Sequence, residues 1–158
     1  MIEMPASVQR FARVLDELGH LERVVVLDDS ARTAAEAAAA LGCEVAEIAK
    51  SIVFRRLDDD AVVVVVTSGD QRVDVGKVAA LVGDVGRADA DFVRAGTGYA
   101  IGGVPPVGHL GAAVVLVDRS LERFARVWAA AGHPHAVFPV APATLVAWHG
   151  EPVDTAVD

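Results

Sequence analysis

The apolar run Ala61–Val66, which contains five consecutive valines, constrains the fold more than any other segment of the chain. β-Branched residues favour extended backbone, and a short apolar run bounded by turn residues is typical of a strand. The segment Lys50–Arg56 precedes it, and Asp58–Asp60 supplies turn residues between the two. We therefore predict a β-hairpin whose strands are Lys50–Arg56 and Ala61–Thr67.

Helical and extended patterns alternate around this hairpin. Further strands are predicted at Val24–Leu27, Val85–Ala88, Ala112–Asp118 and His135–Val140, and residues 151–157 form a tail or an edge strand. Helices are predicted at Ser7–Leu18, from Thr33 to Gly42, at 45–49, Asp74–Val82, Ala90–Ala95, Ser120–Ala131 and Ala143–Trp148. The mixture indicates an α/β (α+β) domain on a mixed sheet, and the pattern does not distinguish an open sheet from a barrel.

Composition narrows the class of protein. A chain of 158 residues is expected to form one domain, 1–158, and its single cysteine excludes a disulfide framework or a multi-cysteine zinc site. The longest apolar runs are about a third of the ~20 residues that a spanning helix needs, so we expect no membrane partner. The N-terminus lacks the pattern of a signal peptide, which favours the cytoplasm. A formal net charge of −8 disfavours DNA binding through a large basic surface, but permits contact with a short nucleic-acid end.

Lys50 is the most informative single residue. In a strand it shares a face with Ile52 and Phe54, which look like core residues, so the ammonium points towards the interior. A charge there is costly unless it meets a partner or a binding site. The alternative is a strand-end lysine whose stem is buried while its head reaches solvent.

The segment Gly96–His109 is a second candidate site. It holds five glycines and two adjacent prolines, which together impose an unusual backbone path. Such a loop can direct consecutive N–H groups at a carbonyl oxygen or a phosphate, although a tight connection between two elements explains it equally well. It matches neither the P-loop nor the dinucleotide-binding fingerprint.

Other candidates are weaker. His109, Asp118 and Ser120 could form a triad, but no nucleophile elbow surrounds Ser120, which is better explained as a helix N-cap. The pair His133 and His135 lacks further ligands at metal-binding spacing, so we expect no metal.

An ordered set of motifs resembles the YbaK/EbsC family, which includes the editing domain of bacterial prolyl-tRNA synthetases and its free-standing relatives. The resemblance covers about residues 24–157, after the N-terminal helix 7–18. Its motifs are Thr33–Gly42, Ile48–Phe54, Thr67–Asp74 with Lys77, Gly98–Gly108, Val117–Leu121, Ala130–Gly132 and Leu145.

The resemblance implies a mixed, barrel-like sheet surrounded by helices. It also implies an aminoacyl-tRNA deacylase acting in trans, without metal or organic cofactor, typically on proline tRNA carrying Ala or Cys. Its partner would be the 3′ acceptor end of the tRNA. The net charge of −8 predicts modest affinity for tRNA, and the hypothesis that follows is an aminoacyl-tRNA synthetase as a second partner. In such enzymes positioning and oxyanion stabilisation carry much of the catalysis, because an aminoacyl ester is already activated.

The same resemblance assigns candidate site residues. Lys50 aligns with the family's functional lysine, and Gly102 and Pro106 align with its Gly-x-x-x-Pro loop; these three are the expected catalytic residues. The expected substrate-binding residues are Ile52, Gly69, Asp70, Gly103, Val104 and Pro105. Many relatives have Ser in place of Pro105, which leaves a non-catalytic module that binds a nucleotide or the aminoacyl-tRNA end as the alternative. A third hypothesis is an unrelated hydrolase that uses His109.

Overall fold

The valine run forms the centre of a hairpin, as predicted. Strands β2 (Ile48–Arg56) and β3 (Val62–Ser68) pair antiparallel, with Ile52 opposite Val65. All residues of β3 are buried. Because successive side chains of a strand point to opposite faces, both faces of the sheet must be covered at β3.

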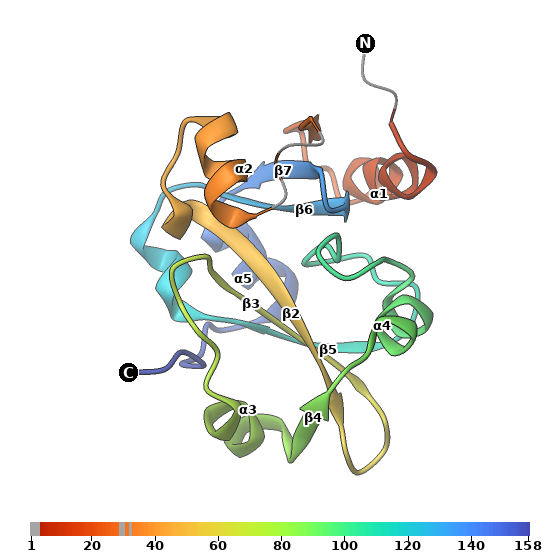
Figure 1. Cartoon of the computed structure of the whole chain (residues 1–158), viewed down its shortest axis with the longest axis vertical. Coiled ribbons are helices and arrows are strands. Elements are labelled where there is room, and N and C mark those ends of the chain that lie inside the picture. Colours follow the sequence, from red (N-terminus) through yellow and green to blue (C-terminus); the bar gives the residue numbers. More distant parts are fainter. Residues whose placement is uncertain (1–3, 29–30, 32) are drawn as a thin grey trace.

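The computed structural model describes residues 4–28, 31 and 33–158. In this part of the chain seven strands form one sheet, in the order β1-β7-β6-β2-β3-β5, with β4 paired to β2 (Figure 1). The pairs β2–β6 and β3–β5 are parallel and the others antiparallel. The remaining strands are β1 (Val25–Val26), β4 (Val85–Arg87), β5 (Ala113–Val117), β6 (Val127–His133) and β7 (Ala136–Val140). The predicted α/β class is confirmed, but the sheet is open and ends at β1 and β5, so the barrel-like detail is not.

Five α-helices and two short 3₁₀ helices join these strands within the described residues. Side chains of Thr33, Asp74 and Asp89 cap three of them by accepting backbone N–H groups. The helices are α1 (Ala6–Glu17), α2 (Ala34–Leu41), α3 (Val75–Val82), α4 (Ala90–Thr97) and α5 (Pro142–His149), with η1 (Val45–Glu47) and η2 (Arg119–Arg123). None of these helices is long and apolar enough to cross a membrane.

Two apolar clusters lie on the two faces of the sheet. The larger includes Val64 of β3, Phe11 of α1 and Leu145 of α5. The smaller includes Val65 of β3 and Val78 of α3, with Phe54 packed against it. Phe54 packs against the smaller cluster and Val53 against the larger one. Lys50 and Ile52 lie on the same strand face as Phe54, because successive side chains alternate between the faces.

The predicted helix at Ser120–Ala131 is wrong. The 3₁₀ helix η2 ends at Arg123, and Val127–His133 forms strand β6. The alanines that favour a helix locally instead fill narrow spaces in the sheet, where Ala129 and Ala131 are fully buried. Pairing with β2 and β7 overrides the local preference. The cap of η2 is Asp118, which accepts the Ser120 N–H, rather than Ser120 itself.

Candidate functional site

The outer edge of β2 is interrupted at its centre. β6 pairs only with the first two residues of β2, and β4 only with its last three. The Arg56 N–H donates to Ala61 O on the hairpin side, so even-numbered residues direct their backbone groups towards β3. The N–H and C=O groups of Ser51 and Val53 therefore face the gap between β6 and β4. In the described part of the chain neither of those strands pairs with them.

A cavity of about 150 Å³ lies beside this interrupted edge. Its walls come from the centre of β2 and from the glycine-rich loop that follows α4. Three predicted site residues, Ile52, Gly102 and Val104, line it together. Sequence reasoning missed its other lining residues, since nothing in their local pattern distinguishes them from core positions: Ser51, Val53, Ala88, Val93 and Ile101.

The loop from Ala100 to His109 depends on two glycines at its start. Gly102 has φ +87°, a left-handed conformation that side chains rarely adopt. A Cβ on Gly103 would lie 2.7 Å from the Cα of His133, so only glycine allows this approach. The Gly132 N–H donates to Gly103 O at 3.0 Å. The loop is thereby held against the irregular end of β6, where the pairing with β7 shifts register.

Two histidines hold the proline pair of the same loop. Nε2 of His109 lies 2.7 Å from Pro105 O, and Nε2 of His149 lies 2.6 Å from Pro106 O. A carbonyl oxygen only accepts, so each ring must donate from Nε2. Burial lowers the pKa of both imidazoles, which favours their neutral forms. Pro105 and Pro106 are themselves buried, so the histidines fix the loop from behind rather than offering side chains to a ligand.

Lys50 lies on the same strand face as Ile52, towards the start of β2. Its Nζ donates to Gln71 O at 2.5 Å. Burial lowers the pKa of this ammonium, and the Asp70 carboxylate opposes the shift. The side chain is partly buried. Lys50 therefore directly precedes Ser51, a lining residue, but does not itself line the cavity.

Gly69 and Asp70 form the turn on which Lys50 rests. A Cβ on Gly69 would collide with Val45 O, so this turn lies directly against η1. Both carboxylate oxygens of Asp70 accept from Arg123, at 2.8 and 3.1 Å, and these hydrogen bonds lower the pKa of Asp70 to about 2. The pair holds the turn to η2. Gly69 and Asp70 support Lys50 and do not line the cavity beside Gly102.

Two of the weaker candidates, Asp118 and His109, form hydrogen bonds with other parts of the chain. Asp118 is buried and accepts from Thr155 and from the Ser120 N–H, while His109 is bound to Pro105 O. No hydrogen bond of the described residues joins His109 to Asp118 or to Ser120, so the structure shows no triad. Among the described residues, no group of three histidine, cysteine, aspartate or glutamate side chains could hold a metal ion.

Comparison with known proteins identifies the family. A family model of the aminoacyl-tRNA editing domain matches residues 28–147, which is most of the chain. The chain belongs to this family. The uncharacterized protein YwhH of Bacillus subtilis (strain 168) is 33% identical to this chain over 123 residues, which are 77% of this chain and 78% of that protein.

Two solved structures extend the likeness to nearly the whole chain. One is of a candidate trans-editing enzyme for prolyl tRNA synthetase, 39% identical, with a TM-score of 0.92 and coverage of 99% of this chain and 100% of the other. The hypothetical protein APE2540 is 32% identical, with a TM-score of 0.84 and coverage of 94% and 99%. The family resemblance drawn from the sequence motifs is therefore confirmed.

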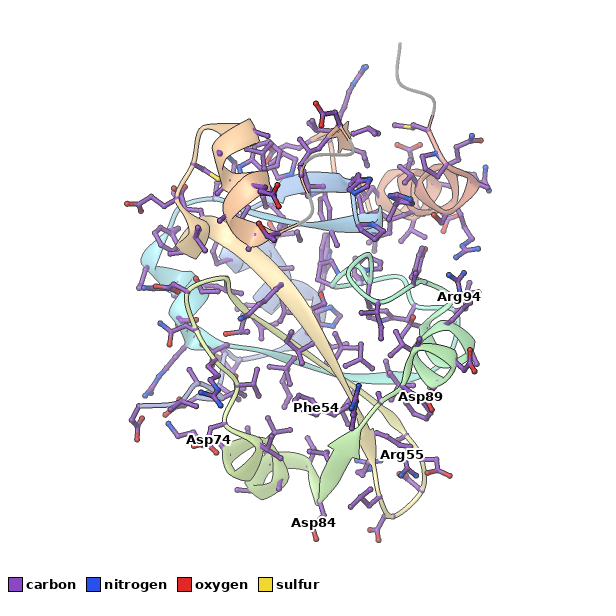
Figure 2. All side chains as sticks on the ribbon, viewed as in Figure 1. Phe54, Arg55, Asp74, Asp84, Asp89 and Arg94 are labelled. Carbon is purple, nitrogen blue, oxygen red and sulfur yellow. The ribbon has the colours of Figure 1, made fainter. Side chains whose placement is uncertain are left out.

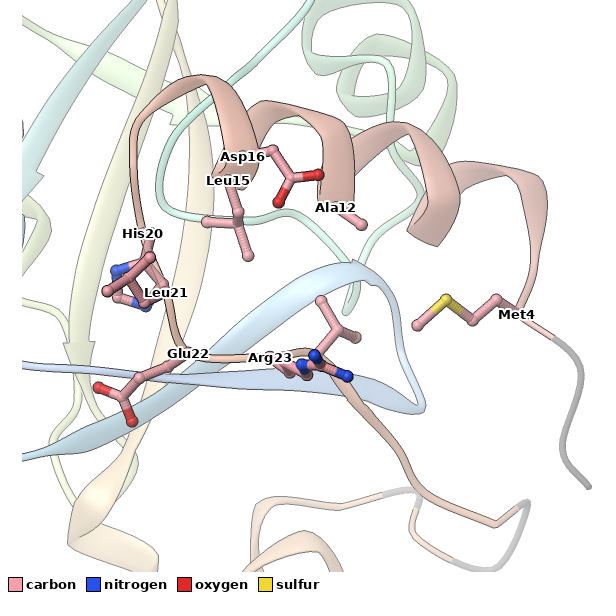
Figure 3. Close-up of a pocket in the computed structure, with 9 residues that line it drawn as sticks. Met4, Ala12, Leu15, Asp16, His20, Leu21, Glu22 and Arg23 are labelled. Carbon is pink, nitrogen blue, oxygen red and sulfur yellow. The ribbon is translucent and has the colours of Figure 1, made fainter.

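A larger cavity of about 480 Å³ lies elsewhere in the chain, apart from the residues named above. Figure 3 shows it between α1 and the segment that leads into β1. Leu15, Leu21 and Val24 supply apolar walls, and Asp16, Glu22 and Arg23 supply charges. All its lining residues precede position 28, where the family match begins. The smaller cavity at Gly102 lies within the matched segment and is the candidate site.

Proposed function

We propose that this editing domain hydrolyses the ester between a wrongly attached amino acid and the 3′ end of a tRNA. The observation that carries the proposal is the cavity of about 150 Å³ shared by the centre of β2 and the Gly102–Val104 backbone. An engineered cavity of about 150 Å³ holds benzene, so this space suits a small amino-acid side chain. Its walls are mainly apolar, and unpaired backbone groups of β2 lie at its margin.

The chemistry proposed for the site is positioning together with stabilisation of charge. As water attacks the ester, the carbonyl oxygen becomes negative, and N–H groups aimed at it lower the barrier. The strand-edge N–H groups of Ser51 and Val53 and the rigid loop at Gly102 are suited to this role. Lys50 supplies a positive charge for the tRNA end, two residues along β2 from Ile52. No side chain of the cavity is assigned as a general base.

Alanine and cysteine on proline tRNA are the proposed substrates. Each methylene changes binding in an apolar pocket by only about 1–3 kcal/mol, so discrimination by size alone is weak. We therefore propose that the tRNA end contributes to selectivity, and that neither a metal nor an organic cofactor takes part. The Pro105 carbonyl accepts from His109, and Pro105 does not line the cavity. We therefore propose that proline, in place of the serine of many relatives, adds no group to the cavity.

The deciding experiment measures deacylation of proline tRNA charged with Ala, Cys or Pro, and of correctly charged Ala and Ser tRNAs. Wild type is compared with Lys50→Ala, and with Lys77→Ala as a matched control. Lys77 is the other lysine of the chain and binds Asp154 and Asp158 instead. We expect release of one wrong amino acid by wild type and Lys77→Ala, and its loss in Lys50→Ala. If none of these esters is hydrolysed, the proposed function is contradicted, and the alternative of a module that binds the tRNA end without catalysis is favoured.

An aminoacyl-tRNA synthetase is the proposed protein partner. A chain with a formal net charge of −8 is expected to bind tRNA weakly by itself, because both carry negative charge. A synthetase that presents the charged tRNA would compensate for this weak binding. Co-elution with prolyl-tRNA synthetase and faster deacylation in its presence are expected; absence of both effects would remove this partner.

A further inference from the structure

A second cavity adjoins the candidate site on the face of β2 that carries Lys50. It has a volume of about 330 Å³ and lies between β2, β4 and the first residue of α3. It shares Ile52, Val53 and Ala88 with the 150 Å³ cavity. A ligand that fills the first space therefore has an adjoining space for its next chemical group.

Phe54 and Arg87 form the distinctive pair of this second cavity, which we call the Phe54–Arg87 cavity. They lie directly opposite each other in the antiparallel β2–β4 ladder, and so their side chains share one face. Figure 2 shows Phe54 where β2 passes β4. The Phe54 ring is partly buried against the smaller core cluster, which restricts its position.

Arg87 differs from the two other arginines of this hairpin region. Arg55 is paired with Asp60 at 2.5 Å and Arg56 with Asp59 at 2.9 Å. Arg87 is exposed, and no carboxylate of the described chain lies within ion-pair distance of it. Its guanidinium is thus available to a ligand at the rim of the cavity.

The lining favours a flat, uncharged group. Ile52, Val75 and Val85 make the walls mainly apolar. Aromatic rings and arginine planes are the surfaces on which proteins stack unpaired bases. The volume exceeds the ~150 Å³ that accommodates benzene, which leaves room for a two-ring base. Figure 2 shows the carboxylates of Asp84 and Asp89 near the two ends of β4, and their charge disfavours a phosphate in this position.

We propose that the Phe54–Arg87 cavity binds the unpaired terminal base of the tRNA 3′ end, while the aminoacyl group occupies the adjoining 150 Å³ cavity. The inference rests on the proposed function, because it needs an aminoacyl ester in that neighbouring space. Alternate residues of β2 place Lys50, Ile52 and Phe54 along one face, over about 13 Å. A nucleotide extends over a comparable length. Along this face the strand presents the ammonium of Lys50, then Ile52, which lines both cavities, and then the ring of Phe54 for stacking.

The test uses uncharged RNA, so that it does not depend on turnover. The full-length protein, with labelled methyl groups, is titrated with the trinucleotide CCA and with the same trinucleotide lacking its terminal base. We expect CCA to shift the methyl resonances of Ile52, Val75 and Val85, and the abasic form to bind at least 5-fold more weakly. Equal binding of the two probes, or shifts confined to the 480 Å³ cavity, would overturn the proposal. The proposal would also be overturned if an apolar peptide shifted these methyl resonances to saturation while CCA did not shift them.

Variants then test the two stacking residues. Arg87→Ala and Phe54→Leu should weaken CCA binding by about 5- to 150-fold, and the leucine retains an apolar contact with the core. Arg94→Ala is the matched control, because Arg94 is an exposed arginine of α4 that lines neither cavity. A loss of affinity in Arg94→Ala equal to that in Arg87→Ala would mean general charge attraction and contradict a base site.

Deacylation separates this proposal from the proposed function. With a charged substrate, Arg87→Ala should raise KM and leave kcat near that of wild type, since the base is remote from the reacting ester. Wild-type deacylation with no preference for CCA over the abasic probe would refute the base site alone. CCA binding without deacylation of any substrate would refute the catalytic function alone.

Discussion

The β2–β3–β5 sheet and the loop from Ala100 to His109 are held in place by different forces. The sheet is stabilised by apolar burial on both faces, shared among many valines. The loop is held by a few specific contacts, namely the close approach of Gly103 to His133 and the hydrogen bonds of His109 and His149. Substitutions in the sheet should therefore act on stability, whereas substitutions in the loop should act first on activity.

Gly103→Ala should have the largest effect. Its Cβ would lie within 2.8 Å of three backbone atoms of His133, so the loop must move away from β6. Misplacement by about 1 Å can cost roughly 100-fold in rate, and we expect a deacylation loss of that order with the fold retained.

Gly76→Ala is the control for Gly103→Ala. It is a glycine of α3 whose Cβ would approach only the side chain of Asp74, and deacylation should stay near that of wild type. Rates are measured at saturating substrate, with circular dichroism to check the fold. Unchanged activity in Gly103→Ala would mean that the loop position does not matter.

Val64→Ala should show the opposite behaviour. Val64 is fully buried in the larger cluster, and loss of two methyl groups there should lower the free energy of unfolding by about 2 kcal/mol. Selectivity among aminoacyl esters should not change. Val157→Ala, at an exposed valine, should stay within about 0.5 kcal/mol of wild type in denaturant unfolding. A selectivity change without a stability change in Val64→Ala would contradict the division of roles.

His149→Leu leaves the Pro106 carbonyl without its donor, which should cost about 1–2 kcal/mol of stability. Activity should fall further than this stability loss explains, because the loop loses its anchor. His149→Gln is the matched variant, since its amide can donate to the same oxygen, and partial recovery of activity is expected. If Leu and Gln behave alike, the hydrogen bond does not position the loop.

The smallest effect concerns pH. Burial lowers the pKa of His109 and His149, so the unfolded chain binds protons before the folded one as pH falls. Their contribution is complete above the ordinary pKa of about 6.5 and declines as pH falls towards their lowered values. The melting temperature should therefore fall between pH 7.5 and 5.5, and fall less in His149→Gln. Hydrogen bonds from Arg123 lower the pKa of Asp70 to about 2, so its contribution to stability is complete above the ordinary aspartate pKa of about 4 and is lost as pH falls from there to about 2.

Local pattern was sufficient for most of the elements and insufficient for one. The valine hairpin and the capped helices depend on residues close in sequence, so they could be predicted. Strand β6 could not, because Ala129 and Ala131 favour a helix unless β2 and β7 lie on either side. For the site, the family motifs led to Ile52, Gly102 and Val104, which do share a cavity. His149 carried no motif signal, since its role depends on α5 lying beneath the loop.

The sequence by itself determined the α/β class, the hairpin, most of the helices and the family, because these follow from residue types at short spacing and from ordered motifs. Tertiary structure decided which face of β2 carries Lys50, where β6 stops pairing, and how the loop meets that gap. These depend on chain segments 29 to 80 residues apart, such as β2 with β4 and β6. Their positions are set by competition for strand partners and burial, which no local pattern records.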